Sequence, residues 1–216
     1  MPVIQTSKIK NIIFDLGGVL LNINPLLSLH ELEKISGISQ GELISKFASE
    51  QIFEKFDTGR LNPDEFRSEL CKILNHNASD SEIDQIWNKL ILDIPPLRVK
   101  MVQEIRNNYK VFLLSNTNSI HFEHYTREFL EIYGFNLVDL FDDVFVSHEI
   151  GIRKPDAGIY TFVLEDAKID APETVFFDDS SANIEAAELL GIRGIQITNG
   201  RDVTSFFTNG MLRQDS

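Results

Sequence analysis

Short hydrophobic runs recur along the chain and predict buried strands. They lie at residues 10–21, where the run leads into a glycine pair, and at 111–114, 144–146, 175–177 and 194–197. These runs are rich in β-branched and aromatic residues and lack the strict alternation of a strand with one solvated face. Strands covered by helices on both faces have this pattern, which is typical of a parallel sheet.

Segments with helical periodicity separate these runs. We predict helices over residues 97–107, 118–133, 156–167 and 180–190, the last ending before Gly191 as a C-cap. Strands that alternate with helices indicate an α/β fold with a doubly wound parallel sheet. Right-handed crossovers in such a fold place the carboxyl ends of the strands along one edge.

The stretch after the first strand has a different character, because its apolar residues recur at helical spacing without a strand-like run. Asn62-Pro63, for example, has the features of a helix start. We therefore predict an inserted all-helical region over residues 22–95. The α/β core then comprises residues 1–21 and 96–216.

Composition restricts the class of protein. The chain has 216 residues, of which 43% are hydrophobic and 25% charged, a balance typical of a folded globular protein. Its formal net charge is −13, and no run of Lys or Arg forms a basic patch, which argues against nucleic acid and anionic membranes as partners. The one cysteine, Cys71, excludes an intramolecular disulfide, and its helical spacing predicts a buried side chain.

No secretory pattern opens the chain, and no apolar stretch reaches membrane-spanning length. We therefore expect a cytoplasmic location. A small metabolite is the expected partner, and a monomer and a homodimer remain equally open.

Four short segments place polar residues at the end of a hydrophobic run or directly before a helix. They contain Asp15 and Gly17; Ser115 and Asn116; Lys154; and Asp178, Asp179 and Asn183. A carboxylate at the end of a buried strand is costly unless a metal, a cation or backbone amides bind it. Aspartates, a hydroxyl and a lysine at one sheet edge match the needs of phosphoryl transfer: a nucleophile, oxygen ligands for a hard cation, and groups that neutralise phosphoryl oxygens.

Each signal has a structural alternative when it is taken alone. Asp15 is compatible with a turn cap, and Ser115 with ordinary turn chemistry. Lys154 is compatible with a solvated position before a helix, and Asp178-Asp179 with a helix cap. The prediction therefore depends on the order of the four segments and on their common context at strand ends.

The four segments resemble the four ordered motifs of the haloacid dehalogenase superfamily, and the helical insert lies where many members carry a C1 cap. Residues 115–118, 147–160 and 176–191 are also similar to a sugar-phosphate phosphatase branch that includes enzymes acting on glucose 1-phosphate. The resemblance implies a Mg²⁺-dependent phosphatase that hydrolyses a small phosphomonoester, with a sugar phosphate favoured, through an aspartyl-phosphate intermediate.

The resemblance also implies a role for each residue of the four segments. Asp15 matches the nucleophile, Ser115 and Asn116 match the residues that bind the phosphoryl group and support it, and Lys154 matches the lysine that neutralises nucleophile and phosphate. The implied metal ligands are Asp15, the backbone carbonyl of Gly17, Asp179 and, through water, Asp178.

Three further residues are candidates for substrate binding. Arg60 lies in the turn of residues 56–61, which in capped relatives reaches over the active site, and this turn is equally well explained as an ordinary connection between helices. Arg153 is the corresponding candidate from the core for a second anionic group. Asn183 belongs to the loop of the fourth motif.

One departure from the family pattern concerns the general acid/base. Most phosphatases of the family carry an aspartate two residues after the nucleophile, where this chain has Gly17, as the resembling sugar-phosphate branch does. A 2-haloacid dehalogenase and a catalytically weak binding or regulatory protein are therefore alternatives. The adjacent acids Asp178 and Asp179 favour magnesium over dehalogenation, because they repel each other unless a cation lies between them.

Other residues have simpler interpretations. His121 and His124 lack a partnering cluster of metal ligands, so we predict surface or helix-packing roles for them. Asp142 is expected to cap a loop, and Trp87 is expected in the hydrophobic core of the insert.

Overall fold

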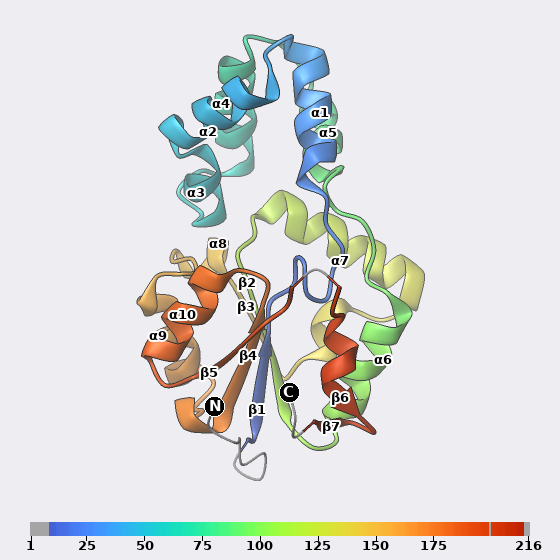
Figure 1. Ribbon diagram of the computed structural model, residues 1–216. Helices are drawn as coiled ribbons and strands as arrows, with labels where there is room; N and C mark the ends of the chain where they lie inside the picture. Colours follow the sequence, from blue (N-terminus) through green and yellow to red (C-terminus); the bar gives the residue numbers. More distant parts are fainter. Residues whose placement is uncertain (1–8, 199, 214–216) are drawn as a thin grey trace.

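The computed structural model describes residues 9–198 and 200–213, which form an α/β core and a helical region beside one end of it (Figure 1). The core contains a five-stranded sheet in the order β3-β2-β1-β4-β5 with parallel pairing throughout. Its strands are β1 (Asn11–Phe14), β2 (Lys110–Ser115), β3 (Asp143–Val146), β4 (Thr174–Asp178) and β5 (Arg193–Gln196). The predicted fold class, an α/β doubly wound parallel sheet, is confirmed.

The central strand β1 is buried on both faces, as its uninterrupted hydrophobic run predicts. Ile12 and Phe14 belong to one hydrophobic cluster, whereas Ile13 belongs to a second one on the other face. Successive side chains of a strand point to opposite faces, so each face contributes to its own core. The covering helices are α6 (Pro96–Ile105) and α7 (Ser119–Tyr133) on the first face, and α9 (Ala157–Asp166) and α10 (Ser181–Leu189) on the second (Figure 1).

Strand register brings the predicted motifs to one edge of the sheet. Phe14, the last residue of β1, pairs with Leu113 of β2 and with Phe177 of β4. The backbone amide of Asp15 then donates to the carbonyl of Phe177 at 2.8 Å. Asp15, Ser115 and Asp178 therefore all lie at the carboxyl ends of neighbouring strands.

Several short elements were not indicated by the sequence pattern. They are α8 (Ser147–Ile150), the 3₁₀ helices η2 (Leu137–Leu140), η3 (Ala171–Glu173) and η4 (Val203–Phe206), and a hairpin of β6 (Phe207–Thr208) and β7 (Met211–Leu212). Elements of two to four residues are too short for a periodicity to be recognised.

The stretch between β1 and α6 is helical. It contains α1 (Pro25–Ser36), α2 (Gln40–Glu50), α3 (Ile52–Asp57), α4 (Pro63–Leu74) and α5 (Asp80–Asn88). Asn62 and Glu65 form a reciprocal capping box at the start of α4, which is the local reason for the predicted helix start. These helices bury their own hydrophobic cluster, in which Phe66 and Trp87 are members as the pattern predicts.

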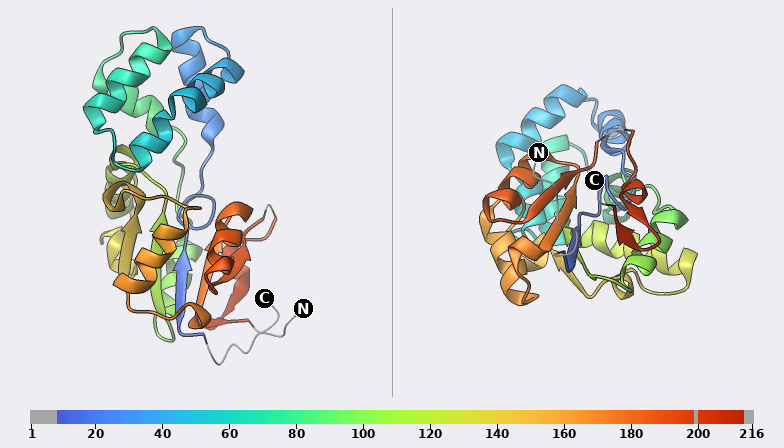
Figure 2. Two further views of the ribbon diagram at one scale, coloured as in Figure 1. Left: turned by 90° about the vertical axis from the view of Figure 1, so that its left-hand side faces the viewer. Right: turned by 60° about the horizontal axis from the view of Figure 1, so that its bottom comes forward.

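Apolar residues at helical spacing continue from Ser81 to Leu92, which predicts a helix over this range, but α5 ends at Asn88 because the chain there turns and pairs with another segment. The amide of Asn22 donates to the carbonyl of Asp93 at 2.8 Å, and the amide of Leu92 donates to the carbonyl of Asn22 at 3.0 Å. An isolated antiparallel bridge between Ile23 and Ile91 completes this contact. Two paired segments thus connect the helical region to the core (Figure 2).

Two further expectations can be compared with the structure. The side chain of Cys71 is only partly buried, so the prediction of a buried cysteine is wrong: it lies at the margin of the helical cluster. Within residues 9–198 and 200–213, no helix has the length and apolar character needed to span a membrane.

Candidate active site

Lys154 connects two strand-end carboxylates at the sheet edge. Its Nζ lies 2.7 Å from Oδ1 of Asp15, 2.7 Å from Oδ2 of Asp178 and 2.9 Å from the carbonyl oxygen of Leu114. The lysine is only 1% exposed. Its three N–H donors are therefore matched to three acceptors, which is the condition under which a buried ammonium is tolerated.

The backbone of Lys154 is held by Asn116. The Asn116 side chain donates from Nδ2 to the Lys154 carbonyl at 2.8 Å and accepts from the Lys154 amide at 2.9 Å. This two-point contact fixes the loop before α9 against the end of β2. Asn116 thus positions the lysine, and its contact with a phosphoryl group stays a prediction.

Asp178, at the end of β4, is fully buried and surrounded by donors. Its Oδ1 accepts from the amide of Ser180 at 2.8 Å and from Nδ2 of Asn183 at 2.9 Å. The carbonyl of Asn183 in turn accepts from the hydroxyl of Tyr160 at 2.9 Å. Asn183 therefore acts on the carboxylate of Asp178, and its contact with a substrate stays a prediction.

Asp15, Asp178 and Asp179 form an acidic cluster. Each offers one carboxylate oxygen, and these atoms all lie within 4.8 Å of one another. Asp179 approaches closely because Gly18 has no side chain: a Cβ at Gly18 would lie 2.4 Å from Oδ2 of Asp179. When ionised, three carboxylates and the one ammonium of Lys154 leave two negative charges, and hard oxygen ligands with that charge suit Mg²⁺.

The cluster changes the proton affinity of its members. Burial raises the pKa of Asp15 to about 7, against the opposing effect of the Lys154 ammonium. Burial and then the charge of Asp178 raise the pKa of Asp179. Burial disfavours the charged form of Lys154, but the carboxylates of Asp15 and Asp178 outweigh it and raise the pKa of the lysine.

Ser115 and Gly17 lie at the same edge. Ser115 is the last residue of β2 and is 3% exposed. Gly17 lies two residues after Asp15 in the tight loop that leaves β1, and it forms an isolated bridge with Leu21. The roles of the Ser115 hydroxyl and the Gly17 carbonyl stay predictions.

The two arginines predicted for substrate binding lie in different surroundings. Arg153 Nη1 lies 3.4 Å from Oδ2 of Asp57, a residue of the helical region. Arg60, by contrast, donates to the Thr58 hydroxyl and pairs with Glu54, both in its own region. Of the ion pairs that the described residues show for these two arginines, the pair of Arg153 connects the helical region with the core, whereas that of Arg60 stays within the helical region.

Asp57 was not identified from the sequence as a site residue. It occupies the end of α3, and its Oδ1 accepts from Nδ2 of Asn118 at 3.2 Å. Asp57 directly precedes Thr58-Gly59 in the turn of residues 56–61, and an acidic residue in that turn is the sequence feature by which it could be found. Its partners, however, come from loops 61 and 96 residues away and are not visible in local sequence.

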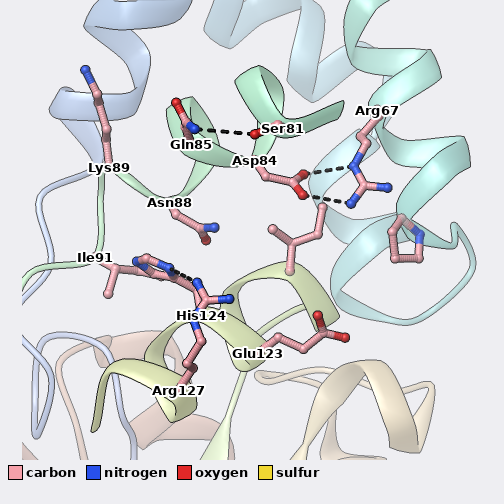
Figure 3. A pocket seen from close by; sticks show the side chains of 12 residues that line it. Arg67, Ser81, Asp84, Gln85, Asn88, Lys89, Ile91, Glu123, His124 and Arg127 are labelled. Carbon is pink, nitrogen blue, oxygen red and sulfur yellow. Dashed lines mark hydrogen bonds and ion pairs between the residues drawn. The ribbon is translucent and has the colours of Figure 1, made fainter. Parts of the chain in front are cut away.

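A cavity of about 690 Å³ lies away from the acidic cluster, between α4, α5 and α7 (Figure 3). It is lined by none of the predicted site residues. Arg67 on its wall is held by both carboxylate oxygens of Asp84, at 2.9 and 2.8 Å. Arg67 is therefore already paired. The other cations of the lining are Lys89, which pairs with Glu31, and Arg127, whose Nη2 lies 3.4 Å from Nδ1 of His124.

The histidines after β2 have packing roles, as predicted. His121 is buried and stacks on Trp87 with ring centroids 5.0 Å apart, and its Nδ1 lies 2.8 Å from Oδ1 of Asn88. His124 lies 3.3 Å from Glu128 on the same helix. Asp142, which was expected to cap a loop, instead binds a strand, since its Oδ2 accepts from the amide of Val111 in β2 at 2.7 Å.

Comparison with known proteins decides the family. The model of the haloacid dehalogenase-like hydrolases matches residues 9–191. The chain belongs to this family. The order of the four strand-end motifs in this chain and its five-stranded parallel sheet agree with that assignment.

Two curated relatives are similar to this chain over most of their length. The chain is 30% identical to the D-ribitol-5-phosphate phosphatase of Bacteroides thetaiotaomicron over 194 residues, covering 90% of this chain and 94% of the relative. It is 29% identical to the sesquiterpene phosphatase of Aspergillus oryzae, covering 88% and 90%.

A solved structure of a family member matches the whole fold. A haloacid dehalogenase family enzyme from Bacteroides thetaiotaomicron, in complex with magnesium and inorganic phosphate, superposes with a TM-score of 0.86 at 34% identity. The match covers 93% of this chain and all of that one. The chain is therefore a hydrolase of the haloacid dehalogenase-like family, and its similar relatives include phosphatases.

Proposed function

We propose that the protein is a Mg²⁺-dependent phosphatase that removes phosphate from a small phosphomonoester, a sugar or polyol phosphate. The acidic cluster of Asp15, Asp178 and Asp179 around the buried Lys154 carries this proposal. A phosphatase named for ribitol 5-phosphate and a structure with magnesium and phosphate among similar relatives support it.

Asp15 attacks phosphorus in line, the bond between phosphorus and the ester oxygen breaks, and the alcohol leaves with a proton taken from water. A second water then attacks phosphorus of the aspartyl-phosphate, which releases inorganic phosphate and restores the Asp15 carboxylate. Lys154, already in contact with Asp15, neutralises charge on the phosphoryl oxygens. The hydroxyl of Ser115 binds the same group, while Asn116 holds the lysine in place.

Asp15, Asp179 and the backbone carbonyl of Gly17 are the proposed ligands of Mg²⁺, with Asp178 beside them. When bound, the ion supplies positive charge to the nucleophile and to the phosphoryl oxygens. The pKa of Asp15, raised to about 7 by burial, supports a need for such charge, because attack requires the ionised carboxylate.

Residues 22–95 form the proposed cap. The paired segments around Asn22 and Asp93 connect it to the core, and Asp57 at the end of α3 contacts core residues Asn118 and Arg153. Closure of such a cap over the sheet edge excludes bulk water during the first chemical step.

The test is phosphate release from a panel of sugar phosphates, nucleotides and an aryl phosphate, with magnesium and with a chelator. Asp15→Asn is compared with Asp166→Asn, which changes an exposed aspartate at the end of α9. We expect release only with magnesium, loss in Asp15→Asn and no loss in Asp166→Asn.

Magnesium-dependent turnover that survives in Asp15→Asn contradicts the proposal. Chelator-insensitive release of halide from a 2-haloacid identifies a dehalogenase instead. Binding of a phosphate ester without any release identifies a protein that retains the fold for binding alone.

A further inference from the structure

The end of α3 contacts the two core loops that flank the proposed phosphate site. Asp57 lies 3.4 Å from Nη1 of Arg153 and accepts from Nδ2 of Asn118 at 3.2 Å. Arg153 directly precedes Lys154, and Asn118 follows Ser115 by three residues in the loop after β2. Asp57 thus lies against the two loops that carry Ser115 and Lys154, the residues that we propose contact the phosphate.

This contact is backed by close packing of the neighbouring turn. Gly59 adopts φ +66°, and a Cβ there would lie 2.4 Å from the carbonyl oxygen of His148 in α8. Only a residue without a side chain permits this approach of the cap backbone to the core. The position of Asp57 relative to Arg153 is thus defined by the backbone as well as by charge.

Asp57 and Arg153 neutralise each other's charge, and both side chains remain partly exposed. The side chains are 16% and 35% exposed, respectively. Burial raises the pKa of Asp57, and the guanidinium of Arg153 and the amide of Asn118 oppose that effect. Arg60, which lies in the turn itself, pairs with Glu54 within the cap.

On the basis of the proposed phosphatase function, we propose that Asp57 is a specificity-determining residue: by neutralising Arg153, it selects phosphomonoesters whose remaining part is an uncharged polyhydroxyl chain and disfavours those with a second anionic group.

The chemistry of the pair explains the selection. A second phosphate or carboxylate on the substrate would meet an arginine whose charge is already compensated, and it would be repelled by the Asp57 carboxylate. Hydroxyl groups, in contrast, donate to a carboxylate and accept from a guanidinium or an amide. Asp57, Arg153 and Asn118 together offer both kinds of partner to a polyol.

The experiment compares kcat/KM for ribitol 5-phosphate with kcat/KM for ribulose 1,5-bisphosphate, which carries a second phosphate at the other end. The wild type, Asp57→Asn, Arg153→Gln and the double variant are measured with magnesium, and circular dichroism checks that each is folded. Asp84→Asn, which removes the carboxylate of a cap ion pair beside the distant cavity, is the matched control.

We expect the wild type to prefer the monophosphate. Asp57→Asn frees the guanidinium and shifts the ratio of kcat/KM values toward the bisphosphate by about tenfold. This factor lies between the effect of losing an exposed charge pair and that of losing a buried one. Arg153→Gln leaves the carboxylate uncompensated and shifts the ratio in the opposite direction. The double variant lies near the wild type, and Asp84→Asn does not change the ratio.

An active Asp57→Asn variant with an unchanged ratio, or a shift of the same sign in Arg153→Gln, overturns the role of Asp57 and leaves the phosphatase function intact. If Asp57→Asn does not fold, the sign of the Arg153→Gln shift decides alone. Absence of phosphate release from both substrates and from an aryl phosphate in the wild type overturns the phosphatase function itself, and the inference with it.

Discussion

The Nζ atom of Lys154 lies 2.7 Å from Oδ1 of Asp15, although 139 residues separate them in the chain. The same ammonium contacts Asp178, so that one cation keeps two buried carboxylates together. The contact requires β1, β2 and β4 to be neighbours, and it places the proposed nucleophile where charge develops during phosphoryl transfer.

Replacement of Lys154 by Met removes this cation and leaves two buried carboxylates facing each other. We expect loss of phosphatase activity and a loss of about 3–5 kcal/mol in the free energy of unfolding without magnesium. Urea denaturation in a chelator and phosphate release with magnesium measure the two effects. Lys100→Met, at an exposed position of α6, is the control, and equal behaviour of the two variants would contradict the account.

Two adjacent glycines allow a test of the metal site. A Cβ at Gly18 would lie 2.4 Å from Oδ2 of Asp179, whereas a Cβ at Gly17 would meet only Ile23, at 3.2 Å from its Cδ1. Gly18→Ala is therefore expected to displace Asp179 and to weaken magnesium binding by at least about tenfold, as changes next to metal ligands do. Gly17→Ala keeps the backbone carbonyl that is proposed to bind Mg²⁺ and adds its Cβ beside Ile23 rather than Asp179, so it should bind magnesium nearly as the wild type does. Calorimetric titration with magnesium gives both affinities, and similar values for the two variants would refute the proposed role of Asp179.

The contact between Gly59 and the carbonyl of His148 tests the docking of the cap. Gly59→Ala introduces both a backbone strain at φ +66° and a clash with that carbonyl. Gly37→Ala, at φ +69° with no atom within 4 Å of the added Cβ, introduces the strain alone. We expect both to lose about 1 kcal/mol of stability from strain, and only Gly59→Ala to raise KM for the phosphate ester. Kinetics and thermal unfolding separate the effects, and an equal KM in both variants would show that docking of this turn is irrelevant to binding.

His121 predicts a dependence of stability on pH. Burial lowers the pKa of His121 to about 3, from 6.5 in the unfolded chain. Below pH 6.5 the unfolded state therefore binds more protons, so the contribution of His121 to stability is complete above pH 6.5 and is lost as the pH falls toward 3. Between pH 7.5 and pH 5 the loss amounts to about 2 kcal/mol.

Urea denaturation at these two pH values measures the effect. His121→Phe preserves a ring against Trp87 and should remove about 2 kcal/mol of the pH dependence. His30→Gln, at an exposed position, should retain the dependence of the wild type. A slope in His121→Phe equal to that of the wild type would contradict a neutral, buried His121.

The sequence predicts the sheet and the strand-end motifs well because these depend on local patterns. An uninterrupted hydrophobic run such as that of β1 needs cover on both faces, and a polar residue directly after it, such as Asp15, must lie at the sheet edge. The capping box of Asn62 and Glu65 is likewise local, and the helix that follows begins where the sequence predicts.

Features that depend on distant parts of the chain were not predicted. The early end of α5 results from pairing of Leu92 with Asn22, which no helical pattern reveals. Asp57 acquires its partners only when the cap lies against the core, and its own neighbours resemble those of an ordinary turn. The bond of Asn116 to the backbone of Lys154 is also tertiary, so no local pattern predicts it, and a contact of Asn116 with a phosphoryl group stays a prediction.

The central claim is that Asp15 carries the phosphoryl group during turnover. Acid quenching of the wild type within the first turnover of a ³²P-labelled sugar phosphate, followed by digestion and mass spectrometry, tests it directly. The account predicts magnesium-dependent label on the peptide that contains Asp15, and none in Asp15→Asn. Full phosphate release with no label on that peptide at any quench time, together with undiminished activity of Asp15→Asn, would contradict it.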